Sequence, residues 1–91
     1  MFILISYDIA ADEIRLKVSK LLVNYGKRVQ KSVFECNLEE KQYLWIKEKI
    51  DTLIDMDTDS VRYYILCLKC VQGIVVSGWG TVSQNEDLFI V

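Results

Sequence analysis

Asp8 is the clearest candidate for a chemically active residue in this sequence, because its carboxylate falls within the otherwise apolar run Phe2–Ile9. A charge at the end of a buried strand is costly unless it is paired, hydrated or bound to a cation. Two such carboxylates about 4 Å apart would repel by on the order of 4 kcal/mol at an effective dielectric constant of 20, which favours a shared proton or a divalent ion. Mg²⁺ suits oxygen ligands. The alternative is structural: Asp8 ends the strand and accepts backbone hydrogen bonds in the next turn.

Positive charge is segregated in one part of the chain. The net charge is −2, yet no acidic residue occurs between Arg15 and Lys31. This stretch carries six basic residues: Arg15, Lys17, Lys20, Lys27, Arg28 and Lys31. Such a set can contact the phosphates of DNA or RNA, and phosphate contacts do not distinguish the two. The alternative is an ordinary solvated helix face.

Composition limits the remaining chemistry. A chain of 91 residues forms a single domain, 1–91, and its 52% apolar content indicates that a further face is covered by association. Histidine is absent, so hydrolysis would depend on carboxylates, tyrosine or a bound ion. The first apolar run is too short for a signal peptide or membrane span, which predicts a soluble, cytoplasmic protein without membrane contact.

Two metal-like motifs are incomplete. The three cysteines predict free thiols in a reducing compartment. Cys67 and Cys70 have zinc-like spacing, but with only Cys36 left a tetrahedral set would have to be shared between chains. The acidic stretch Asp55–Ser60 lacks the glycine and glutamate of a calcium loop, so it is interpreted as a solvated turn.

Hydrophobic periodicity places these residues on elements. Phe2–Ile9 is typical of a central strand, and a helix follows that Asp12 caps and Gly26 stops. Arg28–Asn37 predicts one or two strands, with a break near Lys31–Ser32.

The second half of the chain predicts one helix and further strands. Asn37 offers a cap for a helix that ends before the polar stretch at Asp55. Val61–Leu68 is apolar on both faces and predicts another central strand, Gly73–Gly80 predicts a strand, and Leu88–Val91 a short last one.

This order predicts a ferredoxin-like α+β sandwich, in which both helices cover one face of an antiparallel sheet. The open face is expected to pack against a second copy in a homodimer. The bulkier odd positions from Ile3 to Ile9 should meet the helices, whereas Phe2, Leu4, Ser6 and Asp8 should face the partner. Two copies of Asp8 would then lie near one symmetry axis.

Several segments together resemble the Cas-two family of CRISPR-associated proteins. They are Tyr7-Asp8-Ile9, Arg15, the block from Gly26 through Arg-Val-Gln-Lys-Ser-Val-Phe-Glu to Cys36, and Asp59-Ser60-Val61-Arg62. The resemblance implies a ferredoxin-like homodimer that joins the Cas-one integrase to acquire spacers in adaptive antiviral defence. It also implies endonuclease activity, since some members cut single-stranded RNA or double-stranded DNA in a metal-dependent reaction.

The resemblance also assigns roles to residues. Asp8 is similar to the family's magnesium-binding, catalytic aspartate at the dimer interface, and further nuclease positions match Tyr7, Arg15, Arg28 and Phe34. Lys17 stands where some relatives have arginine, which keeps the charge but loses the bidentate fork. The family pairs its C-terminal strand with the partner chain, a role for residues 81–91.

The mechanistic hypothesis is that paired Asp8 carboxylates hold Mg²⁺, whose water attacks a phosphodiester while Arg15 and Arg28 stabilise phosphate charge. Tyr7 would position the nucleophile or the scissile group. One competing hypothesis is a non-catalytic DNA-binding scaffold for the integrase, in which Asp8 is structural. Another is a toxin or RNA-interference module of the same architecture outside CRISPR systems.

Overall fold

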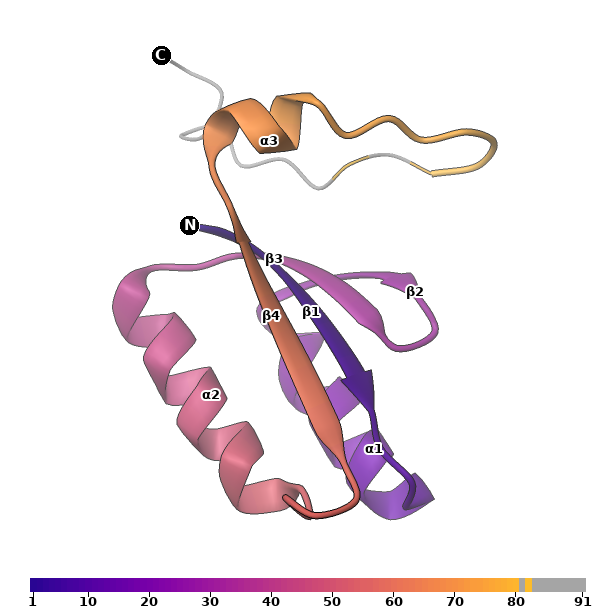
Figure 1. Cartoon of the computed structure of the whole chain (residues 1–91), viewed down its shortest axis with the longest axis vertical. Helices are drawn as coiled ribbons and strands as arrows, with labels where there is room; N and C mark the ends of the chain where they lie inside the picture. Colours follow the sequence, from indigo (N-terminus) through magenta and orange to yellow (C-terminus); the bar gives the residue numbers. More distant parts are fainter. Residues whose placement is uncertain (81, 83–91) are drawn as a thin grey trace.

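The computed structural model describes residues 1–80 and residue 82. The predicted order of strand, helix, two strands, helix and strand is confirmed, and a short third helix follows (Figure 1). The elements are β1 (Phe2–Asp8), α1 (Asp12–Leu22), β2 (Gly26–Gln30), β3 (Val33–Asn37), α2 (Glu40–Leu53), β4 (Ser60–Leu66) and α3 (Leu68–Gln72). None of the helices in these residues is long and apolar enough to cross a bilayer.

The four strands form one antiparallel sheet in the order β2-β3-β1-β4. β1 is therefore an interior strand, as its apolar run predicted. Ile5 lies opposite Phe34 of β3 and Tyr63 of β4, and Asp8 lies opposite Ser60. This register brings the end of β1 next to the start of β4.

One face of β1 forms the core with both helices. Ile3, Ile5 and Tyr7 of β1 and Ile9 directly after it share a cluster with Val18 and Leu22 of α1 and with Ile46 and Ile50 of α2. Each buried aliphatic side chain stabilises the fold by about 1.5–3 kcal/mol. Both helices thus cover one face of the sheet, and the predicted orientation of the odd positions is confirmed.

The opposite face of the sheet is only partly covered. Leu4 and Ser6 are half-buried there, but Phe2 is wholly buried, at the end of the sheet where α3 follows β4 (Figure 1). Leu4 and Tyr64 line a groove of about 690 Å³ together with residues 75–77 and Trp79. The segment after α3 therefore borders the open face, and we call this hollow the open-face groove.

The interpretation of β4 as a central strand is wrong for the described residues. β4 is an edge strand, and it ends at Leu66 because Cys67 begins the turn into α3. Its apolar residues are less buried than the pattern suggests, since Tyr64 is 43% and Ile65 54% exposed. Apolar residues on both faces indicate covered surfaces, but they do not reveal whether both edges are paired.

The predicted strand Gly73–Gly80 is also wrong. The short helix α3 precedes this segment, and no strand forms within it. Gly78 and Gly80 have φ of 85° and 125°, a conformation that interrupts an extended run. The apolar residues there have β propensity, but no described strand is paired with them. The predicted strand Leu88–Val91 and the extension at 81–91 lie outside the described residues, apart from residue 82.

Three predicted helix boundaries are wrong by a few residues. Ala11 rather than Asp12 is the N-cap of α1, because Asp12 already belongs to the first turn. Glu39 rather than Asn37 caps α2, in a capping box with Gln42. Gly26 does not stop α1. It begins β2, where a Cβ atom would overlap Cys36 Sγ and the Glu35 carbonyl of β3.

Candidate functional site

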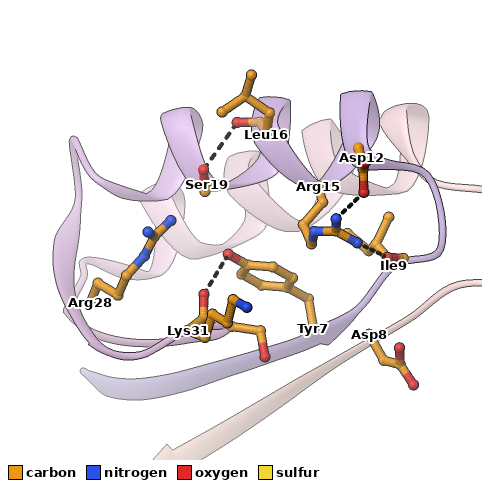
Figure 2. Close-up of a pocket in the computed structure, with 10 residues that line it drawn as sticks. Tyr7, Asp8, Ile9, Asp12, Arg15, Leu16, Ser19, Arg28 and Lys31 are labelled. Atoms are coloured by element: carbon orange, nitrogen blue, oxygen red, sulfur yellow. Dashed lines mark hydrogen bonds and ion pairs between the residues drawn. The ribbon is translucent and has the colours of Figure 1, made fainter.

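A cleft of about 640 Å³ lies where the end of β1, the first half of α1 and the β2–β3 turn meet (Figure 2). It brings three of the predicted basic residues together, Arg15, Arg28 and Lys31. We call it the basic cleft, and its lining residues are Tyr7, Asp8, Ile9, Asp12, Arg15, Leu16, Ser19, Arg28, Lys31 and Ser32. Three cations that line one hollow are a chemistry suited to phosphate groups.

Two aromatic residues, Tyr7 and Phe34, pack beneath the basic cleft. Tyr7 is 3% exposed, and its hydroxyl donates a long hydrogen bond of 3.5 Å to the Lys31 carbonyl. Its ring stacks against Phe34, with 6.3 Å between the centroids. Phe34 is wholly buried, and the Arg28 guanidinium carbon lies 5.2 Å from its ring centroid. Phe34 therefore acts through Arg28 and Tyr7, which it positions, rather than by touching a ligand.

Arg15 holds the end of β1 against the start of α1. One guanidinium nitrogen donates to the Ile9 carbonyl at 2.9 Å, and the other pairs with the Asp12 carboxylate. Arginine has five N–H donors in a rigid fork, so these contacts leave donors for an anion in the cleft. The two contacts also fix the direction from which the guanidinium enters the cleft.

The other three basic residues do not line this cleft. Lys17 and Lys20 are exposed on α1, and Lys27 lines the open-face groove. The helical period explains the first two, because positions 15 and 19 share a face that 17 and 20 do not. Strand alternation directs the side chains of Lys27 and Arg28 to opposite faces of β2, so that only Arg28 lines the basic cleft, although both residues border the open-face groove. The predicted basic set is thus divided between different surfaces.

Asp8 turns its side chain away from the basic cleft, as Figure 2 shows. It is exposed and lines a second hollow of about 240 Å³ with Ser6, Ser60, Arg62 and Tyr64. The predicted orientation of Asp8 on the open face is therefore confirmed. Its carboxylate accepts no hydrogen bond from the described residues, so the interpretation of Asp8 as a turn-forming acceptor is wrong.

One chain offers an incomplete magnesium site. The described residues contain no cluster of three acidic or cysteine side chains. Around Asp8 the hollow adds the hydroxyls of Ser6 and Ser60, but also Arg62, whose pKa is raised by a hydrogen bond to Tyr64. Mg²⁺ is held by one or two carboxylates and several waters. The oxygen donors therefore fit Mg²⁺ best if another copy supplies a second carboxylate.

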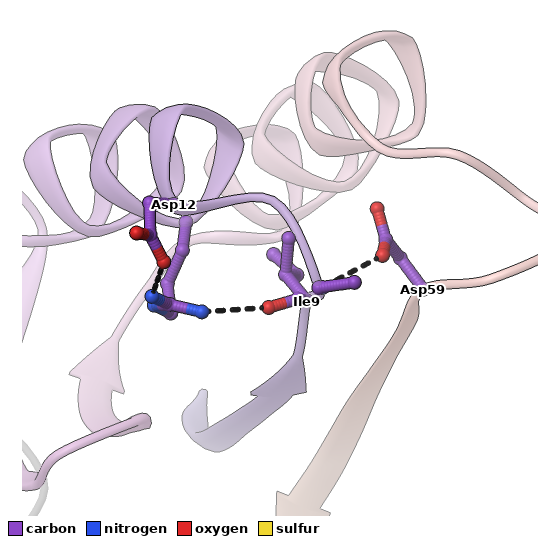
Figure 3. Close-up of polar contacts among 5 residues, drawn as sticks. Ile9, Asp12 and Asp59 are labelled. Carbon is purple, nitrogen blue, oxygen red and sulfur yellow. Dashed lines mark hydrogen bonds and ion pairs between the residues drawn. The ribbon is translucent and has the colours of Figure 1, made fainter.

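The turn-forming role belongs to Asp59, which sequence reasoning treated as part of a solvated turn. One carboxylate oxygen accepts the Ala10 backbone N–H at 3.0 Å, and the other accepts that of Asp55 at 3.0 Å. These bonds lower the pKa of Asp59. Figure 3 shows how Asp59 meets the loop after β1 on the side opposite Asp12. The signal that could have revealed this role is the pairing of the first strand with the last, because that pairing places residue 59 beside the loop after β1.

The fold and these hollows define a small α+β domain that gathers cationic side chains at one end of an antiparallel sheet and exposes the Asp8 carboxylate beside them. A family model described as CRISPR associated protein Cas2 matches residues 1–74. The chain therefore belongs to the Cas2 family of CRISPR-associated proteins, and the resemblance drawn from the sequence motifs is confirmed. The family acts in CRISPR defence.

Curated relatives support this assignment over the full length. A CRISPR-associated endoribonuclease Cas2 of Chloroflexus aurantiacus is 45% identical over 93 residues, which cover 100% of both chains. A CRISPR-associated endonuclease Cas2 of Thermus thermophilus is 42% identical over 60 residues, covering 66% of this chain and 67% of the relative. The names of these two relatives attribute endoribonuclease activity to one and endonuclease activity to the other.

Solved structures have the same fold. Streptococcus pyogenes Cas2 at pH 6.5 superposes with a TM-score of 0.77 at 35% identity, covering 86% of this chain and 100% of that one. A chain of a partial Cas6-RT-Cas1–Cas2 complex has a TM-score of 0.76 at 28% identity and 92% coverage of both chains.

Asp59→Ala should destabilise the protein, because it removes the bond to Ala10, which holds the loop after β1, and the bond to Asp55, which closes the turn before β4. The folded-state pKa of Asp59 is lowered from 3.8, so its contribution is fully present above that value and is lost as the pH falls through the lowered pKa. Urea denaturation from neutral pH to about pH 3 should show the difference from wild type shrinking over that acidic range.

Asp57→Ala is the matched control, since the Asp57 carboxylate makes no hydrogen bond to the described residues although it lies in the same turn. Equal stability losses in the two variants would contradict the bridging role of Asp59.

Proposed function

We propose that this protein is a nucleic-acid-binding endonuclease of CRISPR defence that works as a homodimer, with Asp8 as its metal-binding residue. The observation that carries the proposal is the position of Asp8. Its unpaired carboxylate lies at the rim of a cleft that holds Arg15, Arg28 and Lys31. Phosphate binding and a reacting carboxylate are thereby available at the same end of the sheet.

The basic cleft is the proposed phosphate site. Arg28 is exposed and held over the Phe34 ring, while Arg15 is fixed by Ile9 and Asp12. Cations that are already ordered lose less side-chain entropy when they bind a phosphate. Arg28 and Arg15 would bind and orient the backbone, and Tyr7 at the cleft floor would keep the Lys31 turn in place.

The homodimer is proposed from the open face. Tyr64 and the partly covered Leu4 and Ser6 form a surface of mixed polarity beside Asp8, which a second copy could cover. The strand order β2-β3-β1-β4, with both helices on one face, supports placing the fold in the ferredoxin-like group. A two-fold axis near the end of β1 would bring two Asp8 carboxylates together.

Mg²⁺ is the proposed cofactor, and Asp8 of each copy would hold it. When bound, it supplies an activated water and positive charge at a phosphodiester. The residues of this chain have separate tasks: Asp8 binds the cation, Arg15 and Arg28 bind phosphate oxygens, and Asp59 holds the loop that follows Asp8. We also propose a Cas1-type integrase as partner in spacer acquisition, supported by the similar chain in the Cas1–Cas2 complex.

The second candidate function is a non-catalytic scaffold that binds DNA for the integrase. The observation that favours it is the single carboxylate in the Asp8 hollow, together with the absence of a larger ligand cluster in the described part of the chain. In that case the basic cleft would still bind phosphates, but Asp8 would not contribute to catalysis.

Asp8→Asn keeps the size of the side chain but removes its charge. We expect this variant to lose about 100-fold or more of the magnesium-dependent cleavage rate on labelled RNA or DNA, because the cation loses its carboxylate ligand. Asp51→Asn on α2, where the carboxylate pairs with Lys47, is the matched control and should cleave like wild type.

Undiminished cleavage by Asp8→Asn would reject the nuclease proposal. If wild type binds nucleic acid but cleaves none in the presence of Mg²⁺, the scaffold is the function.

Arg28→Ala should weaken nucleic-acid binding without preference for sequence, because its contacts are to phosphate. The slope of log affinity against log salt should become shallower by about 1 for each Arg28 that contacts a phosphate. Fluorescence anisotropy at several salt concentrations measures it. Lys41→Ala, exposed on α2 and outside the cleft, should leave the slope unchanged. Equal effects of the two variants would show that the cleft is not the binding site.

A further inference from the structure

Two thiols face each other at the junction of β4 and α3. Cys67 is the N-cap of α3, in an extended conformation with φ of −73° and ψ of 166°, and Cys70 follows within the helix. Both side chains are exposed, and their sulfur atoms are 3.4 Å apart. Residues three apart at a helix start share one face, so the pair is held in place by its own backbone.

We propose that Cys67 and Cys70 form a redox-active dithiol, which a low-molecular-weight disulfide such as oxidised glutathione converts into an intramolecular disulfide. The 3.4 Å separation of the sulfurs means that a small rotation of the side chains brings them to the bond length of about 2.05 Å. Exposure gives the oxidant access to both. This site is separate from the basic cleft and does not depend on nuclease activity.

Cys67 is the attacking thiol. Hydrogen bonds from the backbone and the thiol of Cys70 lower the pKa of Cys67, whereas the pKa of Cys70 is raised by its contact with Cys67. The thiolate is the nucleophile in exchange with a disulfide.

The exchange balances in two steps. Cys67 thiolate attacks one sulfur of glutathione disulfide, forms a mixed disulfide and releases one glutathione thiolate, which takes up a proton. Cys70 then loses its proton and attacks the Cys67 sulfur, which releases the second glutathione. The two protein thiols are oxidised by two electrons, and one glutathione disulfide is reduced to two thiols.

Cys36 is an internal contrast. It is wholly buried beside Gly26, and burial raises its pKa to about 11. A buried, protonated thiol is inert to exchange. Only the Cys67–Cys70 pair combines access, proximity and a polarised sulfur, so the reaction should stop after two of the three thiols are used.

The disulfide would constrain a structurally sensitive junction. α3 connects β4 to the segment that lines the open-face groove with Val75, Val76 and Trp79. Closing a ring between Cys67 and Cys70 would fix the start of that segment. The redox state of the pair would therefore act on the segment that borders the open-face groove.

Peptide mapping tests the proposal directly, because Lys69 lies between the two cysteines. Full-length protein is incubated with glutathione disulfide, alkylated under denaturing conditions, and digested with trypsin. We expect the peptides 63–69 and 70–91 to remain joined by a disulfide until a reductant is added, with alkylated Cys36 and no retained glutathione. Cys70→Ser should instead retain one glutathione on Cys67, and Cys67→Ser should react more slowly.

Three results would overturn the proposal. One is a wild-type chain that keeps glutathione on either cysteine, and another is a disulfide between two chains rather than within one. The third is wild-type protein that stays reduced under the conditions in which Cys70→Ser acquires a glutathione on Cys67. Near-ultraviolet circular dichroism of each variant before oxidation checks that the serine substitutions leave the fold intact.

Discussion

The alternation of side chains along β1 is the constraint on which the rest of the site depends. β1 is paired on both sides, by β3 and β4, so its register cannot slip by one residue without moving the core residues to the open face. Tyr7 is therefore fixed in the helix-covered layer and Asp8 on the open face. Consecutive residues thus serve two hollows, one that gathers cations and one that exposes a carboxylate.

The loop after β1 is held from two sides. Arg15 of α1 binds the Ile9 carbonyl, and Asp59 before β4 binds the next backbone N–H. A loop clamped in this way keeps the end of β1 ordered, although the Asp8 carboxylate has no hydrogen-bond partner among the described residues. The exposed Asp8 carboxylate is therefore carried by an ordered backbone. A side chain on an ordered backbone loses less conformational entropy when it binds a cation.

Much of this could be predicted from the sequence because it follows from periodicity. The bulk of the odd positions of β1 determined which face meets the helices, and therefore where Asp8 lies. Two motifs, the one around Tyr7 and Asp8 and the block that ends at Cys36, were sufficient to identify the family. Periodicity does not report on pairing partners, however, so β4 was expected to be central and the apolar segment at 73–80 to be a strand.

The site was harder to predict than the fold. Proximity in sequence suggested one basic patch, but helix period and strand alternation keep Lys17 and Lys27 out of the basic cleft that Arg28 lines. Asp59 was overlooked because an acidic turn is usually solvated, and its acceptor role becomes visible only when β1 and β4 are paired. The short distance between Cys67 and Cys70 likewise depends on α3, a helix that the spacing alone did not reveal.

We propose that the Asp8 carboxylates of two copies together hold one cation. Isothermal titration of the protein with Mg²⁺, combined with light scattering to give its oligomeric state, tests this most directly. We expect a dimer that binds one Mg²⁺ per two chains, with binding abolished in Asp8→Asn. A stoichiometry of one ion per chain, or undiminished binding by that variant, would contradict it.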